Sequence, residues 1–128
     1  MSQENLEEGI DTISEKAMDI IMAAGDARVI CTEALTAAEA FDYVQAYEKV
    51  AEAEKKIAEA HHVQTDVIQG AIGGEKQEYN LLFAHAQDTL MTIYSEIHMT
   101  KKQIKLFEKI NERLEKLEKQ CLKGADYE

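Results

Sequence analysis

The chain has 128 residues, the size of one ordinary domain, and 45% of its residues are hydrophobic while 30% are charged. It contains no Pro, no Trp and only 6 Gly, so little interrupts long helices and the composition predicts an all-α protein. The 25 acidic residues outnumber the 14 basic ones, and a net charge of -11 would repel a nucleic-acid backbone or an anionic membrane surface. We therefore expect a single domain over residues 1–128 that binds no nucleic acid.

The two cysteines and the N-terminal segment indicate in which cellular compartment the protein is expected. Cys31 and Cys121 are too few for a disulfide scaffold, and neither belongs to a CxxC pair. The segment MSQENLEEG is acidic where a signal peptide is basic, and no apolar run approaches the roughly 20 residues that a membrane helix needs. We expect a soluble cytoplasmic protein with reduced thiols and no membrane insertion.

The first third of the chain predicts a long helix. Apolar or small residues recur there at alternating steps of four and three, the heptad pattern of a helix packed lengthwise on others. Gly25 and Asp26 lie inside this pattern, and a helical Gly is less stable than Ala by about 1 kcal/mol, so we interpret them as a bend or a close packing point. The repeat consists of Leu6, Ile10, Ile13, Ala17, Ile20, Ala24, Ala27, Cys31, Leu35 and Ala38.

Two further helices follow. In EAFDYVQA, Asp42 is the expected N-cap of a second helix that runs to about Ala71. The glycine-rich QGAIGGEKQ predicts a loop, and a third helix should run from Glu75 or Gln77 to about Leu122, followed by a frayed tail, KGADYE. Short connections make sequential helices antiparallel, so we expect an up-down-up three-helix bundle. The apolar positions of the second helix include Val44, Tyr47, Val50, Ile57, Val67 and Ile68.

The third helix has two faces of different composition at about 100° per residue. One stripe is apolar and should be buried in the bundle: Leu82, Ala86, Leu90, Ile93, Ile97 and Ile104. A second stripe, displaced by a quarter turn or more, is mixed: Leu81, His85, Asp88, Thr92 and Met99. This mixed face differs from the solvated KINERLEKLEKQ segment and indicates contact with another subunit or a docking partner.

His85 and Asp88 share a face because side chains three residues apart on a helix are neighbours. The spacing alone favours a hydrogen-bonded structural pair. Two ligands from one chain are too few for a metal, and Glu59 with His62 has no second copy. Neutral imidazole is also a good nucleophile that can carry a phosphoryl group as a labile N–P bond, with Leu81, Leu82 and Phe83 as an apolar docking collar.

Three blocks of the sequence resemble a known family. They are AAGDAR at residues 23–28, EAHHVQTDVI at residues 59–68 and LLFAHAQDTLMT at residues 81–92. In this order they resemble the IIA components of the lactose, cellobiose and chitobiose class of the bacterial sugar phosphotransferase system (PTS). HAQD followed by LM is the most specific block, and AHxxQT precedes it at the expected distance.

The resemblance implies that the protein is a phosphotransferase component acting as a phosphoryl carrier. His85 would be the phosphohistidine, carrying phosphate on Nε2. It would accept phosphate from the histidine of HPr and pass it to a cysteine of the IIB component. The IIB and membrane IIC components then phosphorylate the sugar during uptake. The IIC component selects the sugar, so the motifs do not choose among cellobiose, chitobiose and lactose.

The resemblance also implies a homotrimer, a nine-helix assembly in which three Asp88 side chains surround one divalent cation, generally Mg²⁺. Crowded carboxylates need such a cation, although Mn²⁺ or Ca²⁺ would also accept oxygen ligands. His61, Gln64 and Thr65 match the second block, and both interhelical hydrogen bonding and a role near the phosphate are open for them. In the first block, a bend or an intersubunit contact is favoured over chemistry for Gly25, Asp26 and Arg28, and His62 and His98 are expected to be surface or packing residues.

One position departs from the family pattern, and two other classes compete with it. Thr89 stands where many members have a second histidine, which puts in doubt any mechanism that needs one. A histidine phosphotransfer domain of a two-component pathway is also helical, but usually has four helices and a Lys-Gly element after the histidine, where this chain has Ala86 and Gln87. A non-catalytic helical scaffold would explain the heptads and leave the block around His85 unexplained.

Overall fold

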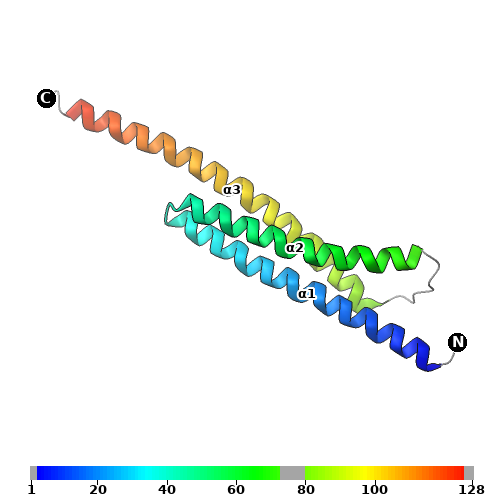
Figure 1. Cartoon of the computed structure of the whole chain (residues 1–128). Helices are drawn as coiled ribbons and strands as arrows, with labels where there is room; N and C mark the ends of the chain where they lie inside the picture. The colour runs from blue at the N-terminus through cyan, green and yellow to red at the C-terminus, as the bar shows by residue number, and fades with distance from the viewer. Residues whose placement is uncertain (1–2, 73–79, 126–128) are drawn as a thin grey trace.

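The computed structural model describes residues 3–72 and 80–125, which form three helices: α1 (Gln3–Glu39), α2 (Tyr43–Ile72) and α3 (Leu81–Ala125). Figure 1 shows α1 and α2 side by side and running in opposite directions, while α3 crosses them and continues past the turn that joins them. The all-α three-helix bundle predicted from the sequence is confirmed. The trimer involves further copies of the chain and stays a prediction.

Alanine dominates the packing of α1 against α2. Small side chains allow two helices to approach closely along their length. The predicted repeat of the first helix is confirmed from Ala17 to Cys31 and at Ala38, although Ala34 is buried where Leu35 is half-buried. The side chains of Leu6 and Ile10 lie outside the described residues. The fully buried alanines of the two helices are Ala17, Ala24, Ala27, Ala34, Ala46, Ala53 and Ala60.

The predicted apolar stripe of α3 closes the core. Its buried members are Ala86, Leu90, Ile93, Ile97 and Ile104, and Leu82 is half-buried against them. On α2, Val50, Ile57 and Val67 are buried as expected. Val44 is exposed because it lies on the side of α2 opposite these buried residues, and Ile68 is exposed because it lies at their edge.

The turn between α1 and α2 explains the change of direction at EAFDYVQA. The Phe41 N–H donates to the Ala38 carbonyl and the Asp42 N–H to the Ala37 carbonyl, both at 3.0 Å, which is the Schellman arrangement of a helix C-terminus. Phe41 occupies the left-handed region with φ 62°, which an L side chain rarely adopts. Asp42 Oδ1 then accepts the Gln45 N–H at 3.1 Å, so its predicted role as N-cap of α2 is confirmed.

The start of α3 differs from the sequence expectation. Glu75 and Gln77, where the helix was expected to begin, lie outside the described residues, and within them α3 begins at Leu81. Asn80 is its N-cap: Oδ1 accepts the Phe83 N–H at 2.9 Å, and Nδ2 donates to Ser14 Oγ of α1 at 3.3 Å. At the other end, α3 continues to Ala125, past the expected end near Leu122 and into the expected tail. Residues 126–128 lie outside the described part.

The structure also bears on the membrane and cysteine predictions. In residues 3–72 and 80–125, no helix combines the length and the apolarity that crossing a membrane requires. Cys31 is buried and Cys121 is exposed, and both are free thiols.

Candidate functional site

His85 lies on the second turn of α3 with its side chain exposed to solvent. The turn before it is held by the Asn80 cap, and the neighbouring Ala86 is buried in the core. Thr89 Oγ1 donates to the backbone carbonyl of His85 at 2.9 Å, a bond that does not involve the imidazole ring. Among the residues that the structure describes, no side chain hydrogen-bonds to the ring. The result is an accessible imidazole on an anchored helix.

The apolar collar expected around His85 is smaller than the sequence indicated. Leu81 is 74% exposed and is available to a partner. Leu82 and Phe83 are partly buried and pack against the core of the bundle instead. Met91, in the block around His85, is 54% exposed and was missed by sequence reasoning, although its position next to Thr92 of the mixed face was the available signal.

Asp88 shares the exposed face with His85, but the two side chains do not form the hydrogen-bonded pair that spacing alone favours. Thr92 Oγ1 donates to the backbone carbonyl of Asp88 at 2.8 Å, and no described side chain donates to the Asp88 carboxylate. In the described part of the chain, no group of three or more His, Cys, Asp or Glu side chains could hold a metal ion. A metal site built from one chain is therefore not present in the described residues, and the site shared by three Asp88 side chains stays a prediction.

The second block lies on α2, and its His61 contacts α3 away from His85. The His61 ring contacts the Tyr94 ring edge-on, with centroids 6.4 Å apart and planes at 65°. Tyr94 follows His85 by nine residues, which is about 14 Å along the helix axis. Within one chain, this contact favours a packing role for His61 over a role near the phosphate.

The other members of this block also have local roles. Thr65 Oγ1 donates to the His61 carbonyl at 2.9 Å, a bond within α2 rather than between helices. Gln64 is buried, with 7% of its surface exposed. His98 lines a small cavity of about 260 Å³ with His61, and His62 is exposed, so both fit the expected surface or packing role.

The first block forms an interhelical ion pair that sequence reasoning missed. Arg28 Nε donates to Glu96 Oε2 at 2.9 Å, and Arg28 Nη2 donates to Glu96 Oε1 at 2.8 Å. This bidentate ion pair joins α1 to α3. This hydrogen-bonded carboxylate raises the pKa of Arg28. The 68 residues between the partners hide the pair from local patterns. Among the described residues, Gly25 is not a close packing point, because a Cβ added there meets nothing within 4 Å.

Comparison with known proteins agrees with this geometry. The family model described as "PTS system, Lactose/Cellobiose specific IIA subunit" matches residues 15–108, which include the His85 region and both other blocks. The lichenan-specific phosphotransferase enzyme IIA component of Bacillus subtilis (strain 168) is 42% identical over 94 residues, covering 73% of this chain and 86% of that protein.

Solved structures show the same fold. The cellobiose-specific enzyme IIA of Bacillus anthracis superimposes with a TM-score of 0.73 at 35% identity, covering 78% of this chain and 92% of that one. The IIA(Chitobiose) chain in a complex with HPr from Escherichia coli gives a TM-score of 0.70 at 32% identity, covering 77% and 96%. This chain therefore belongs to the lactose/cellobiose-specific IIA subunits of the PTS, the bacterial sugar phosphotransferase system.

Proposed function

We propose that the protein is a cytoplasmic phosphoryl carrier that accepts phosphate from phospho-HPr on His85 and passes it to the cysteine of a IIB component. The observation that carries this proposal is the exposed His85 ring, free of described hydrogen-bond partners, on a helix anchored within the family-matched segment. The relative from Escherichia coli was solved in complex with HPr, which supports HPr as the donor.

The chemistry is a pair of displacements at phosphorus. The lone pair of His85 Nε2 attacks the phosphorus of the HPr phosphohistidine; the N–P bond to HPr breaks as the new N–P bond forms. In the second step a IIB thiolate attacks the same phosphorus, an S–P bond forms, and His85 regains its neutral ring. Both steps need open space in line with the breaking bond, which an exposed side chain on the outer face of α3 provides.

The proposed assembly is a homotrimer with Asp88 at its axis. The Asp88 carboxylate is exposed and consists of hard oxygen ligands, so three copies would suit one Mg²⁺ where a single chain is insufficient. When bound, Mg²⁺ would offset the repulsion among the three carboxylates. Native mass spectrometry measures both the subunit number and the bound ion, and replacement of Asp88 by Asn should remove the ion. Thr89, half-buried and bonded to the His85 carbonyl, brings no second imidazole to this face.

The test of the carrier function is intact mass after incubation with HPr, enzyme I and phosphoenolpyruvate. Wild type should gain one acid-labile phosphoryl group, and His85→Ala should gain none because it lacks the nucleophile. His62→Ala and His98→Ala are matched controls, since each removes another exposed histidine. Circular dichroism should show unchanged helix content in all variants.

If His85→Ala still gained the phosphoryl group, the phosphorylated residue would be one other than His85. Absence of label in every protein, including wild type, would remove the carrier function itself.

A further inference from the structure

The last part of α3 extends beyond the bundle. The family match ends at residue 108, while α3 continues to Ala125. Ile104 is the last buried residue described on this helix, and Figure 1 shows α3 projecting past the turn between α1 and α2. The bond from Tyr47 Oη to Glu108 Oε2, at 2.6 Å, is the last interhelical hydrogen bond of α3 in the described residues. From there on, no described residue of α3 is buried.

This projecting part carries a regular apolar row, which we name the C-terminal seam: Phe107, Ile110, Leu114, Leu117 and Cys121. The steps of three, four, three and four are those of alternating a and d positions in a coiled coil. All five residues are exposed in the single chain, with Leu114 at 52% and Leu117 at 53%. The six b, c and f positions between residues 108 and 119 are all charged, and Glu108 among them is the one bonded to Tyr47: Glu108, Lys109, Glu112, Glu115, Lys116 and Lys119.

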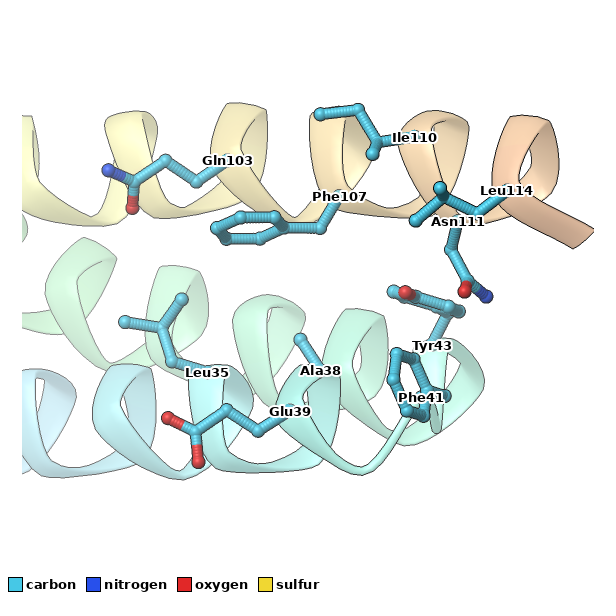
Figure 2. Close-up of a pocket in the computed structure, with 10 residues that line it drawn as sticks. All are labelled: Leu35, Ala38, Glu39, Phe41, Tyr43, Gln103, Phe107, Ile110, Asn111 and Leu114. Carbon is cyan, nitrogen blue, oxygen red and sulfur yellow. The ribbon is translucent and has the colours of Figure 1, made fainter.

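The first half of the seam also borders an open groove. Figure 2 shows Phe107 pointing from α3 toward Leu35 and Ala38 of α1. Together with Phe41 and Tyr43 of the turn region, these side chains line a cavity of about 490 Å³. The apolar surface therefore begins beside the bundle and continues along the free helix.

We propose that the C-terminal seam packs against the same seam of other copies of this chain, as a parallel coiled coil that lengthens the trimer. This rests on the proposed trimer, because Ile110 and Leu117 of the seam lie on the side of α3 that carries Asp88. Leu117 follows Asp88 by 29 residues, which is close to eight turns of about 3.6 residues, so both lie on one side of α3. Copies that meet at Asp88 in parallel therefore also meet at the seam.

The flanking charges favour a parallel copy as the occupant. With Leu114 at an a position, Arg113 is at g and Glu118 at e. In a parallel coiled coil a g residue pairs with the e residue five positions later on the neighbour, so Arg113 meets Glu118 of the next copy. An antiparallel copy would set g positions against g positions and e positions against e positions, so Arg113 would not meet Glu118.

The core residues of the seam suit more than two strands. Dimers favour β-branched residues at a with Leu at d, whereas Leu at a and Ile at d shift the preference to trimers or tetramers. The seam has Leu114 at a beside Ile110 at d. It also lacks the polar Asn or Lys at a core position that fixes register and oligomer state at a cost in stability.

Cys121 provides the test, because it is exposed, free and at an a position of the seam. In a parallel, in-register assembly, mild oxidation with diamide should join the Cys121 thiols of two copies, giving a covalent dimer on a non-reducing gel. The variant Leu114→Ser with Leu117→Ser should lose at least nine-tenths of this cross-link. Lys116→Ser with Lys119→Ser is the matched control at outward positions and should cross-link as wild type does. Cys121→Ser should give no dimer.

Sedimentation measures the assembly separately. Wild type and the lysine control should remain trimeric at protein concentrations where the seam variant dissociates, while all three accept phosphate on His85. If wild type is trimeric but gives no Cys121 cross-link, the proposal of a packed C-terminal seam is overturned and the trimer stands. The same conclusion follows if the seam variant cross-links and assembles as wild type does. A monomeric wild type that still accepts phosphate overturns the seam and the trimer but leaves the carrier function standing.

Discussion

The two halves of α3 show what one chain can stabilise and what it cannot. From Leu81 to Ile104 the helix buries a stripe against α1 and α2 and presents His85 on its outer face. From Lys105 to Ala125 the same helix still carries a row of apolar side chains, but none of its described residues is buried. The difference arises because α1 and α2 end at their turn. A helix that extends past the helices packed against it keeps an apolar face beyond their ends, and another molecule is needed to cover that face.

Replacing one leucine in each half of α3 should give the largest difference in stability between the two halves. Leu90→Ala should reduce the free energy of unfolding by about 2–5 kcal/mol, because Leu90 is 1% exposed and its loss leaves a cavity. Leu117→Ala should change it by less than about 0.5 kcal/mol in dilute protein, since Leu117 faces solvent in the single chain. Urea unfolding followed by circular dichroism measures both.

Repeating these titrations at high protein concentration separates packing within a chain from packing between chains. The cost of Leu117→Ala should then increase, because association adds stability by mass action and the variant weakens association. A Leu117→Ala cost that does not depend on concentration would contradict the division of α3 into a self-sufficient half and a half that needs other copies.

The sequence predicted the parts of this molecule that depend on local periodicity. The stripe from Ala86 to Ile104 and the separate face of His85 follow from helical spacing, and both were confirmed. The Asp42 cap follows from the capping preference of Asp and was also confirmed. The Arg28 and Glu96 pair could not be predicted, because opposite charges are abundant and only the fold selects which two meet. The packing of Phe83 into the core likewise depends on how α3 crosses α1, which no repeat encodes.

The start of the first half of α3 depends on one side chain. Asn80→Ala removes the acceptor for the Phe83 N–H and should lower the free energy of unfolding by about 1 kcal/mol. The first turn of α3 should fray, which would speed hydrogen exchange at the residue 83 and 84 amides and slow phosphoryl transfer to the nearby His85. Asp42→Ala is the matched control, because it removes the equivalent cap of α2 at the other end of the bundle. Equal effects of the two variants on phosphoryl transfer would show that the α3 cap does not position His85.

The hydrogen bond from Tyr47 to Glu108 lies just past the boundary between the two halves. Burial, with this bond and the nearby carboxylate charge, raises the pKa of Tyr47 from 10.0 to about 12. The folded state thus holds the phenol proton more tightly than the unfolded state does, so the stabilisation is complete below pH 10 and is lost as the pH rises through about 12. Tyr47→Phe should lower the free energy of unfolding at pH 8 by about 1 kcal/mol.

The difference between wild type and Tyr47→Phe should shrink between pH 10 and about 12, as urea titrations at each pH would measure. Comparison with the variant at each pH cancels the titration of the lysines, which is common to both proteins. A difference that stays constant over this range would show that the proton on Tyr47 does not couple α2 to α3. Cross-linking of Cys121 should be unchanged in Tyr47→Phe, because the proposed seam is stabilised by other copies rather than by this hydrogen bond to α2.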